Sequence, residues 1–192
     1  MSHPPLYLIR QETPQDHKAV FELIEEAFRE LVVSDHQEQF LVERLRLSQT
    51  HFVPQLSLVA HTLDGEIIGH ILLTKCHILQ PRDRLHQRIE SLALAPLSVK
   101  PTFQRKGIGA ALVHEAHSIA TQLGFTSVVV VGHPDYYPKF GYRPAKQFGI
   151  AFPFEVPDEC GMVIELQSGA LKECRGGIVE YAPEFQIGEN KE

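Results

Sequence analysis

The chain has 192 residues, of which 43% are hydrophobic and 22% charged, as expected of a globular protein that buries one core. It carries 18 Lys and Arg against 24 Asp and Glu, a net charge of −6, so we expect no nucleic-acid partner, because phosphate-binding surfaces are usually basic. No apolar run approaches the roughly 18 residues of a spanning helix, and the first residues show no secretory pattern. We therefore expect a cytoplasmic protein without a membrane partner.

The cysteines and histidines do not follow a metal-binding pattern. Cys76, Cys160 and Cys174 are widely spaced, and we expect three partly buried thiols in a reducing compartment. The pair His114 and His117 lies in HEAH, which is not the HExxH spacing that brings two imidazoles onto one zinc ion. On a helix both face away from the apolar side, so we expect surface histidines and no metal.

The first third of the chain predicts one strand and two helices. Residues 6–10 are strand-like, and Thr13-Pro14-Gln15-Asp16 supplies an N-cap, a proline at the first helical position and an acidic third residue. Apolar residues then recur at helical spacing to about residue 31. Residues 34–37 resemble a capping box that opens a second helix through Leu45.

A strand pattern starts near residue 56. Residues 56–61 alternate, Asp64-Gly65 is a hairpin turn, and residues 66–76 form the return strand. A polar loop covers residues 80–88, and an apolar strand follows at 89–99. That strand contains Pro96, which cannot donate to a ladder, so the sheet must bulge or lack a partner there.

A glycine-containing turn connects this strand to the next helix. The segment SVKPTFQRKGIGAAL, residues 98–112, predicts a strand end, a tight turn and a helix from about 109 to 123 that ends at Gly124. Residues 126–131 read as a buried strand, which completes a right-handed crossover. Further strand candidates lie at 148–154, 162–166 and 178–181.

The turn has the properties of an anion site. Gly107 and Gly109 let the backbone approach a ligand closely, and the first N–H groups of the helix are free beside its positive dipole end. Arg105 and Lys106 add positive charge. A dinucleotide fingerprint is excluded by Leu112 at its third glycine position, and a Walker A loop is absent. The alternative is a glycine-tightened turn with surface basic residues.

Two motifs together resemble a known family. The pattern Q-x-x-G-x-G at residues 104–109 and Y-x-x-x-G-Y at residues 137–142 resemble the GCN5-related N-acetyltransferase (GNAT) family. The run VVVVGHPDYYPKFGYRPA resembles a bacterial subgroup of predicted N-acetyltransferases with a C-terminal extension. The resemblance implies an α/β fold with a mixed, mostly antiparallel twisted sheet that splays between its fourth and fifth strands and is flanked by helices. It also implies an acetyl-CoA-binding core at 1–145 and an extension of short strands at 146–192, packed on the same domain.

The resemblance places a cofactor site on the turn, with acetyl-CoA as co-substrate and no metal. The pantetheine arm would pair with the backbone of Leu97, Ser98 and Val99. Gln104 and Arg105 would lie at the mouth of the loop. The amides that would hold the pyrophosphate are those of Lys106, Gly107, Ile108, Gly109 and Ala110.

The resemblance also names a proton donor. Tyr137 occupies the position whose phenol protonates the departing thiolate in many relatives. The resemblance does not place the general base as clearly. The position that carries a glutamate in relatives falls near Ala93, and Glu90, the carboxylate on this strand, lies three residues earlier. A water chain to His133 or Asp135, or an amine that arrives neutral, remains open.

The expected function is an acetyl-CoA-dependent N-acetyltransferase, an acyltransferase in which an amine of a small molecule or protein attacks directly in a ternary complex. A non-catalytic acyl-CoA-binding sensor or regulatory module is the alternative, and a longer acyl chain or an alcohol acceptor is a third reading. A homodimer is open, since many relatives form one. Six basic residues flank the predicted site of the polyanionic cofactor: Arg82, Arg84, Arg88, Lys100, Arg105 and Lys106.

Overall fold

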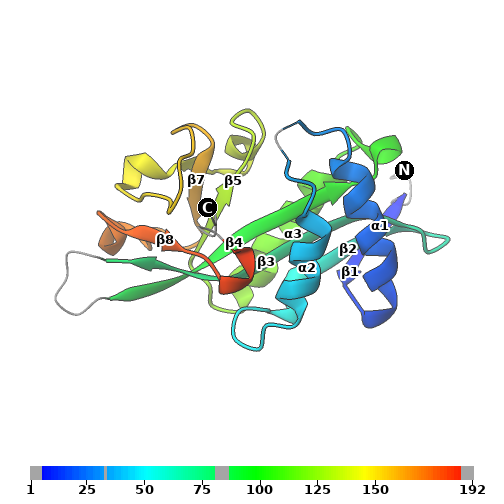
Figure 1. Ribbon diagram of the computed structural model, residues 1–192, viewed down its shortest axis with the longest axis horizontal. Helices are drawn as coiled ribbons and strands as arrows, with labels where there is room; N and C mark the ends of the chain where they lie inside the picture. The colour runs from blue at the N-terminus through cyan, green and yellow to red at the C-terminus, as the bar shows by residue number, and fades with distance from the viewer. Residues whose placement is uncertain (1–5, 33, 81–86, 187–192) are drawn as a thin grey trace, which may run out of the picture. The chain divides into compact units, whose positions relative to one another are not determined.

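The structure is a computed structural model that describes residues 6–32, 34–80 and 87–186 (Figure 1). Its helices and strands, in chain order, are β1 (Tyr7–Gln11), α1 (His17–Phe28), α2 (Glu38–Arg46), β2 (Ser57–Thr62), β3 (Ile67–Leu79), β4 (Arg88–Val99), α3 (Ile108–Gln122), β5 (Ser127–Val131), β6 (Arg143–Pro144), β7 (Gly161–Glu165) and β8 (Ile178–Glu180). Short 3₁₀ turns lie at Pro14–Asp16, Pro54–Leu56, Pro101–Phe103, Tyr137–Phe140, Ala145–Phe148, Lys172–Cys174 and Pro183–Phe185.

The strands form one mixed sheet in the order β1-β2-β3-β4-β5-β7-β6, with β8 beside β3. Strands β4 and β5 are parallel, whereas the pairs β1/β2, β2/β3, β5/β7, β6/β7 and β3/β8 are antiparallel. The predicted mixed, mostly antiparallel α/β fold is therefore confirmed.

The chain forms two compact units. The described residues within 6–47, 52–73 and 95–119 make the first unit, and those within 48–51, 74–94 and 120–186 make the second. Strands β3 and β4 and helix α3 contribute residues to both. The division predicted near residue 145 separates a cofactor-binding core from a C-terminal extension, which is a different division from these two units. It stays a prediction.

The first unit begins with the predicted helix cap. The Thr13 N–H and hydroxyl both donate to Asp16 Oδ2, at 2.8 and 2.9 Å. Arg10 donates to both oxygens of the same carboxylate, at 2.6 and 2.9 Å. The Arg10 hydrogen bonds, with those from Thr13, hold the pKa of Asp16 well below its usual range despite its burial.

The predicted capping box at residues 34–37 is wrong. Helix α2 begins at Glu38, and the residue before it makes no side-chain cap. Instead Ser34 Oγ accepts the N–H of His36 at 2.9 Å, and Asp35 Oδ1 accepts the N–H of Gln37 at 3.0 Å. Short polar side chains that bond two residues ahead form turns, and here they compete with the helix for the same residues.

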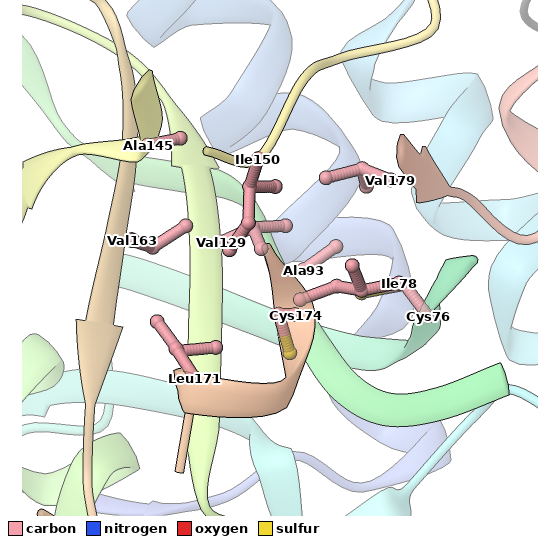
Figure 2. Close-up of a cluster of buried hydrophobic side chains, with 10 residues drawn as sticks. All are labelled: Cys76, Ile78, Ala93, Val129, Ala145, Ile150, Val163, Leu171, Cys174 and Val179. Carbon is pink, nitrogen blue, oxygen red and sulfur yellow. The ribbon is translucent and has the colours of Figure 1, made fainter. Parts of the chain in front are cut away.

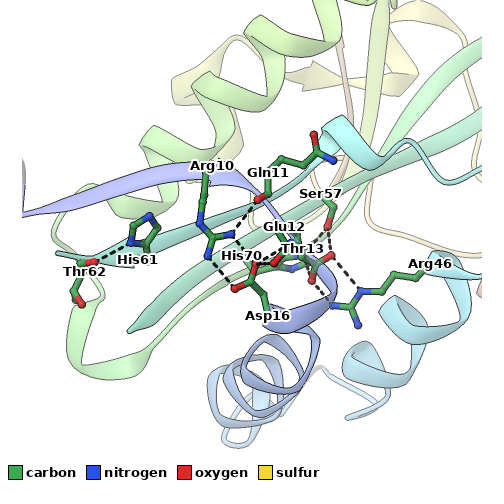
Figure 3. Close-up of polar contacts among 10 residues, drawn as sticks. All are labelled: Arg10, Gln11, Glu12, Thr13, Asp16, Arg46, Ser57, His61, Thr62 and His70. Carbon is green, nitrogen blue, oxygen red and sulfur yellow. Dashed lines mark hydrogen bonds and ion pairs between the residues drawn. The ribbon is translucent and has the colours of Figure 1, made fainter. Parts of the chain in front are cut away.

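A buried polar cluster joins four elements of the first unit (Figure 3). Glu12 after β1 accepts hydrogen bonds from Arg46 of α2 and, at 2.7 Å, from Ser57 Oγ of β2. His70 Nε2 of β3 lies 3.2 Å from Ser57 Oγ and 3.9 Å from Glu12 Oε1. Burial alone raises the pKa of Glu12, but the Arg46 hydrogen bonds, together with His70 and Ser57, lower it overall.

We expect the ion pair of this cluster to stabilise the first unit strongly. The side chains of Arg46 and Glu12 are only 8% and 2% exposed, so Arg46→Met leaves a buried carboxylate uncompensated and should cost about 3–5 kcal/mol of unfolding free energy. Urea denaturation measures this value. The control is Lys18→Met, which breaks a pair whose side chains are 89% and 62% exposed and should cost at most about 1 kcal/mol. Equal losses in the two variants would contradict the expectation.

The core of the second unit surrounds β5. Figure 2 shows side chains from β3, β4, β5, β7, β8 and the C-terminal loops that meet there: Cys76, Ile78, Ala93, Val129, Ala145, Ile150, Val163, Leu171, Cys174 and Val179. Cys76 and Cys174 are buried, Cys160 is half-buried, and all three are free. The prediction of partly buried thiols holds for Cys160, whereas Cys76 and Cys174 are fully buried.

The strand predicted at residues 148–154 is wrong. The chain there ends a 3₁₀ turn, Ala145–Phe148, and Gly149 adopts a left-handed conformation with φ +69°. Only a single bridge, from Ala151 to Ile178, follows. A left-handed residue interrupts the extended backbone that a strand needs. The segment is therefore an irregular loop and not another strand.

Candidate functional site

Strand β4 loses its β5 partner half-way along its length. The parallel register contains the pairs Leu92–Val128 and Ala93–Val129 and ends there. Pro96 follows, and proline has no N–H to give to a ladder. The predicted break in the sheet at Pro96 therefore agrees with the observed register, and the segment Leu97–Val99 continues β4 beyond the last β5 pair.

The turn after β4 is tied to the end of the strand. The Lys100 N–H donates to the Ile68 carbonyl of β3 at 2.9 Å. The side-chain amide of Gln104 donates to the Val99 carbonyl at 3.1 Å. Gln104 thus fixes the turn on the strand. The sequence predicts for Gln104 only a position at the mouth of the loop.

The turn itself has the backbone shape of an anion nest. Arg105 and Gly107 both have positive φ, +62° and +82°, and alternating conformations of this kind point successive N–H groups into one concavity. The first bond of helix α3 runs from the Ala111 N–H to the Gly107 carbonyl at 3.0 Å. In an α-helix the amides before that bond have no carbonyl acceptor within the helix. They are those of Ile108, Gly109 and Ala110.

A glycine on β3 sets the position of this helix. A Cβ on Gly69 would lie 3.0 Å from Leu112 Cδ1 and 3.1 Å from Ile108 Cγ2. These two side chains come from the first turns of α3 and are buried. Helix α3 therefore packs directly on the β3 backbone, which holds its N-terminus in place.

The basic rim is smaller than predicted. Lys100 pairs with Glu66 at 2.5 Å, and Arg88 pairs with Glu180. Arg82 and Arg84 lie outside the described residues. Arg105 and Lys106 remain exposed at the turn, and the Lys106 ammonium lies 4.9 Å from the centre of the Phe103 ring.

The two histidines of α3 differ in their surroundings. His114 is exposed as predicted, but His117 is half-buried. Burial, with a smaller effect of His114, lowers the pKa of His117 to about 4. The prediction of a surface site is therefore wrong for His117, because the apolar face of α3 is wider than its strict periodicity indicates. In the described residues no group of three His, Cys, Asp or Glu side chains is arranged to hold a metal ion.

Tyr137 belongs to the second unit and starts the 3₁₀ turn Tyr137–Phe140 after β5. Its ring packs edge-on against Tyr136 and Tyr142, with centroids 5.2 and 5.5 Å away. Burial raises the pKa of the Tyr137 phenol, with a further contribution from Tyr136. The phenol therefore stays protonated at neutral pH, and its proton is held more tightly than that of an exposed tyrosine.

Gly132 makes room for the Tyr137 ring. A Cβ at position 132 would lie 2.2 Å from Tyr137 Cε2, so even alanine requires the ring to move. Gly132 lies within the run VVVVGHPDYYPKFGYRPA, but the sequence alone does not indicate its role. Its position at the end of an apolar strand was the available signal.

Glu90 lies at the surface of the second unit and not in a buried site. Its carboxylate is exposed and lies 3.5 Å from the Lys75 ammonium. Ala93 is buried in the core around β5. His133 and Asp135 are exposed, and the Asp135 N–H donates to His133 Nδ1 at 3.2 Å. Glu90 and Tyr137 share the second unit, and no contact between their side chains occurs among the described residues.

Comparison with known proteins identifies the family. The model of the acetyltransferase (GNAT) family matches residues 18–142, which is more than half of the chain. The chain therefore belongs to the GNAT family of acetyltransferases, and the predicted resemblance and acyltransferase class are confirmed.

Relatives and solved structures agree with this family. The chain is 28% identical to the uncharacterized N-acetyltransferase YhbS of Escherichia coli over 93% of its own length and 98% of that protein. It is 36% identical to the uncharacterized N-acetyltransferase YjhQ of the same organism, a match over 55% of the chain that spans only 56% of YjhQ.

Two crystal structures of relatives contain the cofactor. The structure of Escherichia coli YhbS in complex with CoA has a TM-score of 0.82 at 26% identity and covers 97% of this chain and 96% of that one. A GNAT acetyltransferase from Brucella melitensis in complex with acetyl-CoA has a TM-score of 0.73 at 26% identity and covers 93% of this chain and 97% of that one. In the described part of this chain, no helix is long and apolar enough to cross a membrane.

The lowered pKa of His117 predicts a pH dependence of stability. Between pH 6.5 and about 4 the unfolded chain binds a proton at this residue and the folded chain does not. The contribution of neutral His117 to the free energy of unfolding is therefore complete above pH 6.5. It is lost as the pH falls toward 4, by at most about 1.4 kcal/mol per pH unit. NMR titration of His117 should show a midpoint near 4. His117→Gln should flatten the stability curve in this window, whereas the matched variant His114→Gln should flatten it less; a midpoint above 6 would contradict this.

Proposed function

We propose that the chain transfers the acetyl group of acetyl-CoA to an amine by direct attack in a ternary complex. The observation that carries the proposal is the turn before α3, where two positive-φ residues, free helix amides and two exposed basic side chains lie together. The crystal structures of relatives with CoA and acetyl-CoA support the same ligand for this turn.

The proposed site for the pantetheine arm is the edge of β4 beyond Ala93. Backbone groups of Leu97, Ser98 and Val99 follow the last β5 pair, and buried backbone groups need hydrogen-bond partners. The amide groups of a pantetheine arm can supply them. The Val99 carbonyl already accepts a bond from Gln104, and one edge of β4 pairs with β3, so the proposed partners of the cofactor are the groups on the opposite edge.

The proposed site for the pyrophosphate is the turn itself. The amides of Lys106, Gly107, Ile108, Gly109 and Ala110 would donate to its oxygens, as helix N-termini do for phosphates. Arg105 and Lys106 add charge that favours a polyanion. Gln104 acts on the shape of the turn through its bond to Val99.

Tyr137 is the proposed proton donor. The amine lone pair attacks the acetyl carbonyl carbon and a C–N bond forms; the C–S bond then breaks, and the thiolate takes the proton of the Tyr137 phenol. The attacking nitrogen loses one proton, and the Tyr137 phenolate regains one from solvent, so that the turnover balances. Glu90 is the proposed acceptor of that proton on β4, in competition with its partner Lys75; transfer to water, directly or through His133 or Asp135, is the other route.

The turn is tested by a glycine variant. Gly107 has φ +82° and open space where a side chain would stand, so Gly107→Val should fold but distort the turn, because β-branched residues avoid positive φ. We expect at least about a tenfold weaker binding of CoA by calorimetry, since misplaced amides lose hydrogen bonds to charged oxygens.

Gly65 offers a matched control for this variant. It has φ +90° and equally open surroundings, but it lies in the β2–β3 hairpin. Gly65→Val should therefore bear the same strain and bind CoA as the wild type does. Normal CoA binding by Gly107→Val, or equal loss in both variants, would refute the proposed loop.

The proton donor is tested by removal of one hydroxyl. Tyr137→Phe should lower kcat for amine acetylation by about 100-fold, the lower end of general acid catalysis, and should leave the affinity for acetyl-CoA unchanged. Thiol release against a panel of amines measures the rate. Tyr136→Phe removes the neighbouring, more exposed hydroxyl and should keep wild-type kcat. Equal rates for wild type and Tyr137→Phe would exclude the acid role.

A further inference from the structure

A cavity of about 790 Å³ lies in the second unit, between the 3₁₀ turn after β6 and the start of β7. Its volume falls within the range of small-molecule sites, roughly 300–1,000 Å³. We call it the 145–161 cavity. Its apolar lining includes Ile150, Phe152, Phe154 and Val156, and its polar lining comes from Lys146, Glu155 and Asp158.

The wall of the cavity rests on the β7 backbone. Gly161 lines the cavity, and a Cβ there would lie 2.6 Å from the Phe152 ring and 3.2 Å from Val156 Cγ1. The loop that carries both side chains therefore packs directly on the strand. Any side chain at position 161 would collide with the Phe152 ring and displace it.

One residue that lines the cavity is paired, through the backbone, next to the residue that supports Tyr137. Gly161 pairs with Val131 at the end of β5. The next residue, Gly132, donates its N–H to the Cys160 carbonyl at 3.0 Å and leaves room for the Tyr137 ring. The proposed proton donor and the cavity wall are thus built on adjacent residues of the same strand pair.

The charge of the cavity favours a cation. Asp158 is neutralised by Lys146, whose ammonium lies 2.5 Å away. Glu155 is exposed, and no cationic nitrogen of the described residues lies within ion-pair distance of its carboxylate. One negative charge therefore remains at the cavity, which attracts an ammonium and repels a carboxylate or phosphate.

The rings of the cavity favour an apolar, aromatic body. The centroid of Phe154 lies 6.0 Å from that of Phe152 and 5.9 Å from that of Tyr181, on which it stacks. Phe154 is 38% exposed, so part of its ring is accessible to a ligand. Aromatic walls bind ring systems by edge and stacking contacts and attract cations through their faces.

We propose that the 145–161 cavity is the acceptor site and takes a small primary ammonium attached to an aromatic body. Glu155 holds the ammonium form as it binds, Phe152 and Phe154 contact the ring, and the ammonium loses one proton to water before its nitrogen attacks. The inference rests on the proposed function, because it names the class of amine that the acetyl group reaches. It also gives the loops between β6 and β7 a role in specificity.

The test uses 2-phenylethylamine as probe, followed by its effect on backbone amide NMR signals of the full chain. We expect shifts centred on Phe152, Glu155 and Gly161, and about a fivefold or larger rise in the dissociation constant for Glu155→Gln. Glu159→Gln, an exposed carboxylate outside the cavity lining, is the matched control and should bind as the wild type does. Two further ligands separate charge from ring: 2-phenylethanol lacks the ammonium, and n-butylamine lacks the ring.

Each outcome decides the proposal. Weaker binding of both comparison ligands, and loss of the preference over n-butylamine in Phe152→Leu, would support it. Shifts that miss the cavity, no binding at millimolar probe, or equal effects of Glu155→Gln and Glu159→Gln would overturn it. Calorimetry of acetyl-CoA with the same samples separates the two levels: if acetyl-CoA binds normally, only the acceptor assignment fails, whereas absent acetyl-CoA binding contradicts the proposed function itself.

Discussion

The backbone hydrogen bonds of β4 are the constraint on which the proposed site depends. A central strand must satisfy its N–H and C=O groups on both edges, yet the pairing of β4 on β5 ends at Ala93. Pro96 removes one donor from the segment that follows. One edge of β4 pairs with β3; on the other edge, an extended, amide-bearing chain would satisfy the groups of Leu97–Val99 as a neighbouring strand does. In the proposed site, the pantetheine arm would complete the sheet.

Local features of this arrangement could be predicted from the sequence because each depends on neighbouring residues. The break at Pro96 follows from its missing N–H, and the turn before α3 follows from the backbone freedom of Gly107. The hydrogen bonds from Thr13 to Asp16 span only two intervening residues. By contrast, the failed strand at 148–154 was read from apolar composition alone, and the left-handed conformation of Gly149 depends on tertiary packing, since Arg175 and Gly176 lie against it.

Features that join distant elements could not be predicted in the same way. Glu12, Arg46, Ser57 and His70 come from four elements, and 34 and 45 residues separate Glu12 from Arg46 and Ser57. No periodicity marks them, because each is a single polar residue in its own segment. The same holds for the paired charges of the rim: Lys100 and Arg88 read as ligands for an anion, yet Glu66 and Glu180 already neutralise them. A count of basic residues along the chain overestimates the charge available to a cofactor.

Two glycines give the second unit its functional geometry. Gly132 and Gly161 lie next to each other across the β5–β7 junction, and each admits an aromatic ring where a Cβ would collide, Tyr137 at 2.2 Å and Phe152 at 2.6 Å. The positions of these rings are therefore set by main-chain contact, which is stiffer than contact between flexible side chains. A shift of β7 against β5 would move the Gly161 support together with the Cys160 carbonyl that holds Gly132. The proposed proton donor and the wall of the 145–161 cavity are thus joined through one backbone junction, so a displacement of one would reach the other.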